Sequence, residues 1–242
     1  MSQHYGAKDP LKGAVSTTGL IFYIHPHLKQ CWDGNSTNLL DLVNGQVCTL
    51  SNITRDTADG NFVFNGSSSK IDTNSTYIDV GGDYTLSSSV DDYTLEAWIY
   101  VETSQGTTTN ADSIIGSTSI VGVGMQVGIT GSVPRINFAA RSTSNFYGSN
   151  FSYNTWRHVV WAHDTGVGST VYVNGVQETT ASGGSYDISG ASGFGNITIG
   201  NSSGRVTGWY DGKMGPIRMY NRAITSTEAL QNFNASRAKY GL

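Results

Sequence analysis

The hydrophobic positions of residues 93–101, YTLEAWIYV, recur with a period of two, which predicts a β-strand. The two alternating sets are Leu95, Ala97, Ile99 and Val101 on one face and Thr94, Glu96, Trp98 and Tyr100 on the other. Because both sets contain apolar side chains, we expect a central strand that is covered on both faces. Residues 157–162 show the same period and predict a second strand, with Val159 and Trp161 on one face.

Two shorter apolar runs, residues 170–173 and 176–179, flank the dipeptide Asn174-Gly175. Asn-Gly in this position predicts a β-hairpin with a type I′ turn, because both central residues of that turn need positive φ. The apolar run 19–24 predicts the first strand of the chain. The sequence also contains 30 glycines and abundant serine, threonine and asparagine, which suits many short strands joined by tight turns.

The end of the chain has a different pattern. Thr225 is followed three residues later by Glu228, which is the spacing of a helix capping box. Leu230 and Phe233 then share one helical face, and basic residues complement the carboxyl end of the helix dipole. These features predict one short helix over residues 226–239.

Several segments occur in a characteristic order: GLIFYIHP, YTLEAWIYV, NTWRHVVWAHD, STVYVNGVQETT, NITIG and WYDGKMGPIRMYNRAIT. Together they resemble the laminin-G-like, concanavalin A-like jelly-roll domains. The resemblance implies an all-β fold, an antiparallel two-sheet jelly-roll sandwich with a short C-terminal helix. It divides the chain into an N-terminal arm (1–18), a laminin-G-like sandwich (19–224) and a C-terminal helix packed on the sandwich (225–242).

Charge and hydropathy narrow the classes of partner. The net charge is -4 and no basic run occurs, so we expect no nucleic-acid partner. No apolar run approaches the roughly 20 residues that a membrane-spanning helix needs, so we expect no membrane segment. The first residues, MSQHYGAKDPLKGAV, lack the apolar region of a secretory signal, and we expect synthesis in the cytoplasm of the host without Sec-type export. Charged residues make up only 13%, which suits either a glycan-facing surface or packing within a larger assembly.

The two cysteines, Cys31 and Cys48, do not form a disulfide framework, and free thiols are favoured over a single bridge. His25-Pro26-His27 places two imidazoles at alternate positions, which is a possible metal geometry. The intervening proline indicates a strand end, however, and two ligands do not make a metal site.

Glycosidases generally need two carboxyl groups about 5 to 9.5 Å apart. Glu96 and Glu102 share a strand face, but six residues at about 3.3 Å each would separate them by roughly 20 Å. The aspartates at 91–92, 79 and 83 are typical of turns and strand ends. The sequence also contains no G-x-S-x-G nucleophile elbow and no Cys-His signature. We therefore predict that the protein is not an enzyme.

The resemblance also implies a calcium site, because many relatives hold calcium with loop carboxylates and carbonyl oxygens. Relatives often have aspartates where Asn65 and Ser69 stand, so two of those charges are missing here. Calcium takes six to eight oxygen ligands, usually including several carboxylates. The carboxylates that remain are Asp33, Asp41, Asp72 and Asp211, of which Asp72 and Asp211 are the candidate ligands, and we expect no other cofactor.

Sugar binding would require an exposed aromatic platform beside amide and hydroxyl groups. The aromatic candidates in polar surroundings are Phe146, Tyr147, Trp209 and Tyr210. The alternative for Trp209 is a place on the core.

The first strand and the segment IRMYNRAIT with the following EALQNFNASRAKYG resemble laminin-G-like proteins encoded by tailed phages. That resemblance implies a virion structural protein, in particular a capsid decoration or cement subunit on the capsid surface or on a fibre, with possible glycan binding. Its expected partners are phage capsid or tail proteins, sister subunits in a homo-oligomer such as a trimer, and host-surface glycans. The alternative is a carbohydrate-binding adhesion module on a tail fibre or a cell surface.

Overall fold

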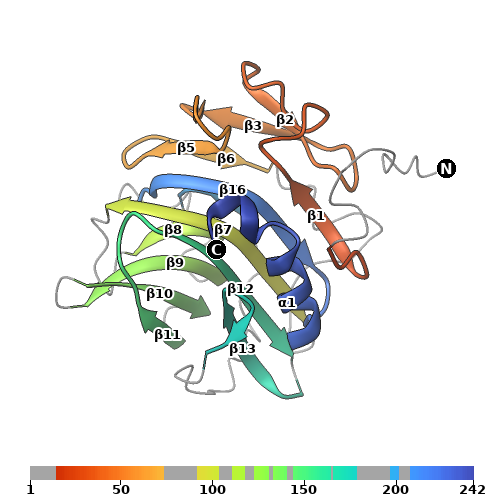
Figure 1. The fold of residues 1–242 in the computed structure, drawn as a ribbon, viewed down its shortest axis with the longest axis vertical. Helices are drawn as coiled ribbons and strands as arrows, with labels where there is room; N and C mark the ends of the chain where they lie inside the picture. Colours follow the sequence, from red (N-terminus) through yellow and green to blue (C-terminus); the bar gives the residue numbers. More distant parts are fainter. Residues whose placement is uncertain are drawn as a thin grey trace.

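The computed structural model describes residues 15–73, 92–103, 111–117, 123–130, 133–140, 144–164, 166–178, 197–201 and 208–242. Within these residues, two antiparallel sheets of eight strands each form a sandwich (Figure 1). One α-helix lies across the outside of one sheet. This architecture confirms the predicted all-β sandwich with a short C-terminal helix. No helix among the described residues is long and apolar enough to cross a membrane.

Sheet A has a long strand at its centre. Its strands are β1 (Leu20–Ile24), β4 (Thr54–Arg55), β5 (Phe62–Asn65), β7 (Tyr93–Thr103), β12 (Trp156–Asp164), β13 (Gly168–Val173), β14 (Val176–Gln177) and β16 (Asp211–Tyr220). Their order is β14-β13-β12-β7-β16-β5-β4, and β1 also pairs with β16. β7 therefore lies between β12 and β16, as expected of a central strand. The register of β16 against β7 shifts between Met214 and Ile217, so Pro216 lies at an irregularity where no ladder hydrogen bond is lost.

Sheet B faces sheet A across the core. Its strands are β2 (Asn38–Leu40), β3 (Val47–Ser51), β6 (Lys70–Asp72), β8 (Asp112–Ser117), β9 (Val123–Thr130), β10 (Val133–Ala140), β11 (Ser144–Asn150) and β15 (Ile197–Ile199). Their order is β11-β10-β9-β8-β15-β6-β3-β2. The edges of this sheet are therefore β11 and β2.

The alternation predicted for β7 and β12 is confirmed. The side chains that face the main core include Leu95, Ala97, Ile99, Val101, Val159 and Trp161. Val160 and Ala162, on the opposite face of β12, join a second apolar cluster with Ala229 of the C-terminal helix. Apolar surface on both faces of these strands is buried because the helix covers the outside of sheet A.

The predicted hairpin is also present. Asn174 and Gly175 have φ of 51° and 75°, the positive values that a type I′ turn requires, and they connect β13 to β14. The last strand is shorter than expected, since β14 contains only Val176–Gln177. The predicted strands at residues 19–24 and 157–162 correspond to β1 and β12.

The C-terminal helix ends earlier than predicted. Helix α1 spans Ser226–Asn234, and its capping box between Thr225 and Glu228 is formed as expected. A separate 3₁₀ segment, η2 (Arg237–Tyr240), follows, so the expectation of one helix to residue 239 is wrong. The break allows the Tyr240 ring to stack on Trp98 with 4.2 Å between ring centroids. Burying this aromatic pair against sheet A outweighs the continuation of the helix.

A buried charge cluster lies between α1 and sheet A. The Oε1 atom of Glu96 accepts hydrogen bonds from Arg218 and from His158 Nε2, the latter at 2.9 Å. Its Oε2 atom accepts from Asn232 Nδ2 of α1 at 2.7 Å. Burial alone raises the pKa of Glu96, but the Arg218 guanidinium and His158 outweigh burial and lower it to about 2. A charged hydrogen-bond network therefore ties the helix to the sheet.

The expected N-terminal arm does not extend to residue 18. Val15 and Ser16 are buried, and the Ser16 backbone N–H donates to Asn232 Oδ1 at 2.8 Å. The Ser16 carbonyl accepts from the Tyr220 hydroxyl at 3.1 Å. Residues 15–18 thus belong to the folded domain, and residues 1–14 lie outside the described residues.

Candidate functional site

The predicted sugar-binding aromatics come from segments that are not adjacent in the fold. Phe146 and Tyr147 are in the edge strand β11, where they pair with Phe138 and Asn137, and their side chains lie outside the described residues. Trp209 is partly buried. Its neighbour Gly208 accepts a hydrogen bond from the backbone of β8, and two strands separate β8 from β11.

Tyr210 was expected to contact a glycan, and this expectation is wrong. The side chain is fully buried, and its ring packs edge-on against Phe64 with 5.6 Å between centroids. Its hydroxyl donates to the Lys213 carbonyl at 3.2 Å, and burial raises the pKa of Tyr210 well above its ordinary value. Tyr210 immediately precedes β16, and the backbone at this point directs its side chain into the core.

The two candidate calcium ligands belong to different sheets. Asp72 is in β6 of sheet B and lies 3.8 Å from the Lys70 ammonium, whereas Asp211 is in β16 of sheet A and accepts from the Thr103 hydroxyl at 2.5 Å. The amide oxygen of Asn65 accepts from the backbone of its own turn. No group of three or more His, Cys, Asp or Glu side chains that could hold a metal occurs among the described residues. The predicted pair therefore does not form a carboxylate cluster.

The two histidines of the His25-Pro26-His27 segment are linked by a hydrogen bond within that segment. His25 is buried, and its Nδ1 accepts from the His27 backbone N–H at 3.3 Å. Burial, followed by the charges of His27 and Arg218, lowers the pKa of His25 to about 2. Cys31 and Cys48 are both buried free thiols, as predicted.

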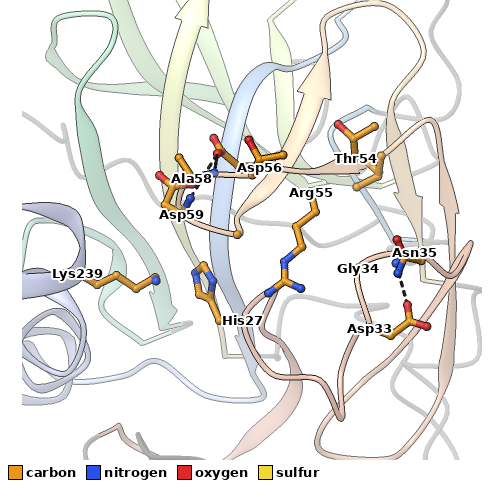
Figure 2. Close-up of a pocket in the computed structure, with 13 residues that line it drawn as sticks. His27, Asp33, Gly34, Asn35, Thr54, Arg55, Asp56, Ala58, Asp59 and Lys239 are labelled. Atoms are coloured by element: carbon orange, nitrogen blue, oxygen red, sulfur yellow. Dashed lines mark hydrogen bonds between the residues drawn. The ribbon is translucent and has the colours of Figure 1, made fainter.

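A polar pocket of about 900 Å³ lies on the outer surface near these histidines, and sequence analysis did not predict it. Residues 27, 33–35, 53–60 and 239 line the pocket. They come from the loop between β1 and β2, from the β4–β5 hairpin with the residue before it, and from η2. Figure 2 shows His27 between Lys239 and Arg55, with the aspartates of the hairpin above them. The pocket therefore lies between residues of the first quarter of the sequence and Lys239 near its end.

The β4–β5 hairpin is held by Asp56. Its Oδ1 accepts from the Ala58 backbone N–H at 2.7 Å, and the Gly60 N–H donates to the Asp56 carbonyl at 2.9 Å. The other carboxylate oxygen forms an ion pair with Lys213 of β16. The Lys213 ammonium lowers the pKa of Asp56 to about 2, so this carboxylate stays charged and fixes the hairpin to sheet A.

The opposite wall of the pocket is fixed by Asp33. Its Oδ1 accepts from the backbone N–H groups of Asn35 and Ser36, at 2.9 and 2.7 Å, and these hydrogen bonds lower the pKa of Asp33. The preceding Trp32 is buried and donates from its indole Nε1 to the Ser36 carbonyl at 2.9 Å. Local hydrogen bonds therefore hold this carboxylate in its own turn.

His27 presents a hydrogen-bond acceptor to the pocket. Its Nε2 is 2.9 Å from Asn61 Oδ1, which also accepts from the Tyr240 hydroxyl at 3.3 Å. An amide oxygen only accepts, so Nε2 carries the proton. Burial, and after it the Lys239 ammonium, lower the pKa of His27 to about 4. The ring is therefore neutral near pH 7, and Nδ1 is an acceptor beside Gly60.

The Arg55 guanidinium lies between two glycines. A Cβ at Gly34 would be 3.0 Å from Arg55 Nη1, and a Cβ at Gly60 would be 3.2 Å from Nε and 3.2 Å from Nη2. The same position at Gly60 is 3.1 Å from His27 Nδ1. Both glycines have φ above +70°, a conformation that side chains disfavour. Glycine at these positions leaves the guanidinium and the imidazole open to the pocket.

The sequence profile of the concanavalin A-like lectin/glucanases superfamily matches residues 65–229, more than half of the chain. The chain belongs to this superfamily. The pocket is built outside the matched segment, from residues 27–60 and 239. The pocket is therefore a feature of the flanking segments of this member of the superfamily.

Solved structures with the same fold include glycan-related proteins. Trypanosoma rangeli sialidase is 15% identical with a TM-score of 0.64, over 93% of this chain but only 34% of the sialidase. Domain 4 of AbnA, an extracellular arabinanase from Geobacillus stearothermophilus solved with arabinotriose, is 15% identical with a TM-score of 0.58, over 88% of this chain and 97% of that domain.

A third structure, the W1252A mutant of HCR D/C VPI 5995, is 15% identical with a TM-score of 0.60, over 90% of this chain and 52% of that one. No curated protein has a sequence significantly similar to this chain. Identities at this level show a shared fold, and the chain spans about a third of the sialidases that it matches.

Sequence reasoning missed the pocket for a physical reason. Asp33-Gly34 and Asp59-Gly60 are turn dipeptides, and the His-Pro-His segment resembled a strand end. These local signals are the same whether or not the turns meet in space. Arg55, His27 and Lys239 come together because the β4–β5 hairpin, the β1–β2 loop and η2 pack against one another.

Proposed function

We propose that this domain binds carbohydrate without transforming it, and that the pocket between His27, Arg55 and Lys239 is the binding site. The observation that carries the proposal is a formed polar pocket whose cationic and imidazole groups remain available for a ligand. Sugar hydroxyls both donate and accept hydrogen bonds, so a site with guanidinium and ammonium donors beside an imidazole acceptor suits them.

Membership of the lectin/glucanase superfamily supports the proposal. Support also comes from the fold shared with AbnA domain 4, which was solved with arabinotriose and matches this chain over 97% of its length. A pocket that is already formed on a β-sandwich needs little rearrangement to receive a ligand, which reduces the entropy lost on binding.

The carboxyl groups support binding rather than hydrolysis. A glycosidase needs a carboxylic acid whose pKa is raised, so that it carries a proton near neutral pH. Of the three aspartates that line the pocket, two have a lowered pKa: Asp33 through hydrogen bonds from backbone N–H groups, and Asp56 through the Lys213 ammonium. Glu96 is fully buried beneath α1 and is closed to any substrate.

A glycan array that includes neutral and acidic saccharides would test the proposal, with the full chain as the probe. Ala58→Trp places a bulky ring on the pocket wall, and we expect it to abolish binding. Val167→Trp is the matched control, because Val167 is 84% exposed in the β12–β13 turn and does not line the pocket. Absence of any saccharide binding by the wild-type protein would refute the function. Unchanged binding by Ala58→Trp would place the site elsewhere.

A second proposal concerns where the domain works, and it follows from the resemblance of both ends of the chain to laminin-G-like proteins of tailed phages. In this proposal the domain is a capsid decoration or fibre subunit, and residues 1–14 contact a neighbouring subunit. A low charged fraction of 13% is consistent with a surface that packs in an assembly. Co-sedimentation with undecorated capsids, with and without residues 1–14, tests it, and binding that is absent in both forms would refute it.

A further inference from the structure

We propose that the pocket selects saccharides that carry a negative charge, either a carboxylate or a sulfate ester, and that Arg55 is the residue that recognises this charge. The inference rests on the proposed carbohydrate-binding function of the same pocket. It names the class of sugar, which neither the fold nor the superfamily specifies.

Arg55 is a cation that lacks a protein partner within the described part of the chain. Its side chain is partly buried against Gly34 and Gly60, yet no hydrogen bond or ion pair to its guanidinium occurs among the described residues. None of its nitrogens is among the buried atoms of the described residues that lack a hydrogen-bond partner, so the planar fork of five N–H donors is open to solvent and to a ligand. Carboxylates and sulfates match this fork with two parallel hydrogen bonds.

None of the three aspartates that line the pocket forms a hydrogen bond or ion pair with Arg55 among the described residues. Asp33 is turned toward the backbone amides of its own loop, and Asp56 toward the hairpin amides and Lys213. The Oδ1 atom of Asp59 is buried and makes no hydrogen bond within the described residues. Because Asp33 and Asp56 are satisfied elsewhere and Asp59 forms no ion pair with Arg55, an anionic ligand would meet an unpaired guanidinium.

Lys239 adds a second positive charge on the other side of His27 (Figure 2). The charges of Lys239 and Arg55 lower the pKa of His27, whereas the Asp59 carboxylate raises it, so two cations and one anion lie near this imidazole. The neutral ring can then accept a hydrogen bond from a ligand hydroxyl at Nδ1. A ligand with a charged group and an adjacent hydroxyl fits this arrangement, which is the pattern of a uronic acid or a sulfated sugar.

Gly34 and Gly60 leave space around the Arg55 side chain. A Cβ at Gly34 or Gly60 would crowd the Arg55 guanidinium, since it would lie 3.0 to 3.2 Å from the guanidinium nitrogens. Gly34 and Gly60, which both have positive φ, therefore leave the Arg55 guanidinium accessible to a ligand. The Asp33-Gly34 and Asp59-Gly60 dipeptides therefore form turns and also leave space for the Arg55 side chain.

Calorimetric titration of the full chain with matched sugar pairs would test the inference. The probes are oligogalacturonate, the same oligomer as its methyl ester, and a galactan oligomer with and without sulfate. We expect tighter binding of the charged member in at least one pair, weakened by added salt because the pair is partly exposed. The pair that shows the preference distinguishes carboxylate from sulfate.

Arg55→Met should weaken binding of the charged probe by roughly 10- to 100-fold, as expected for loss of hydrogen bonds to a charged group. Arg55→Lys keeps the charge but loses the fork, so we expect an intermediate affinity. Arg237→Met, an exposed arginine outside the pocket lining, is the control and should bind as the wild type does. Thermal melts would verify that each variant is folded.

The outcomes separate the two proposals. Equal binding of charged and neutral probes, or a charge preference that survives in Arg55→Met, would overturn the inference and leave carbohydrate binding standing. Failure to bind any probe or any saccharide on the array would refute the carbohydrate-binding function itself, and the inference with it.

Discussion

Replacing Glu96 by glutamine removes the negative charge that faces Arg218 beneath α1. Both side chains are fully buried, and the Glu96 Oε1 atom accepts from Arg218. Burial alone lowers the pKa of Arg218, but the Glu96 carboxylate outweighs burial and holds that pKa above its ordinary value. A guanidinium is not deprotonated in proteins, so in the variant Arg218 would be a buried charge without its anionic partner.

The expected loss of stability is large. Removing one partner of a buried ion pair typically costs about 3 to 5 kcal/mol, because the remaining charge is left uncompensated. Glutamine also presents an amide N–H group where Oε2 now accepts from Asn232 Nδ2, so the hydrogen bond to α1 is lost or rearranged. Domains are stable by only about 5 to 15 kcal/mol, so this variant should lose a substantial part of its free energy of unfolding.

Urea unfolding at pH 7, followed by tryptophan fluorescence, would measure this loss as a fall in the midpoint at constant slope. Glu102→Gln is the matched control, since Glu102 is an exposed glutamate of the same strand and should change stability by less than about 0.5 kcal/mol. The double variant Glu96→Gln/Arg218→Met should recover part of the loss, because the buried unpaired charge is gone. A loss below about 1 kcal/mol in Glu96→Gln would refute the reasoning.

The same pair predicts a dependence on pH. The pKa of Glu96 in the folded protein is about 2, below its ordinary value of 4.5. A depressed folded-state pKa means that the carboxylate stabilises the fold above pH 4.5, and that this contribution is lost as the pH falls toward 2. The difference in stability between wild type and Glu96→Gln should therefore narrow across this interval.

Three further changes have defined outcomes. Thr225→Ala removes the helix N-cap and should lower the free energy of unfolding by about 1 kcal/mol in urea titration, whereas Thr225→Ser should be nearly neutral. Gly200→Ala would place a Cβ 2.3 Å from the Phe64 ring at a φ of +84°, and a loss of about 2 to 5 kcal/mol is expected from strain and overpacking. Cys31 and Cys48 should resist a thiol reagent in the native protein and react fully in denaturant, because burial raises the pKa of Cys31 to about 12; prompt native labelling would contradict this.

Much of the fold could be predicted from the sequence because the signals for it are local. The alternation of residues 93–101 decides which side chains can share a face of β7, whatever lies opposite them. Asn174-Gly175 supplies the positive φ of a type I′ turn, and Thr225 with Glu228 closes a capping box within one helical turn. Each of these features depends on residues at most a few positions apart.

The end of the helix and the fate of Tyr210 depended on packing instead. Nothing in residues 234–240 alone stops the helix, but stacking Tyr240 on Trp98 requires the chain to turn back, and Gly215 leaves room for its hydroxyl. Tyr210 has the same polar neighbours as an exposed aromatic, and only the approach of Phe64 from β5 places it in the core. A contact between distant strands overrode the local composition in both cases.

By itself, the sequence determined the sandwich, its central strands, the tight turns and the helix start, because backbone sterics and side-chain periodicity act within short stretches of chain. Only the tertiary structure decided that Arg55, His27 and Lys239 meet in one pocket, and that Asp72 and Asp211 lie on different sheets. The physical reason is that the order of strands in each sheet sets which turns become neighbours. An Asp-Gly turn at the pocket has the same sequence as one that faces open solvent.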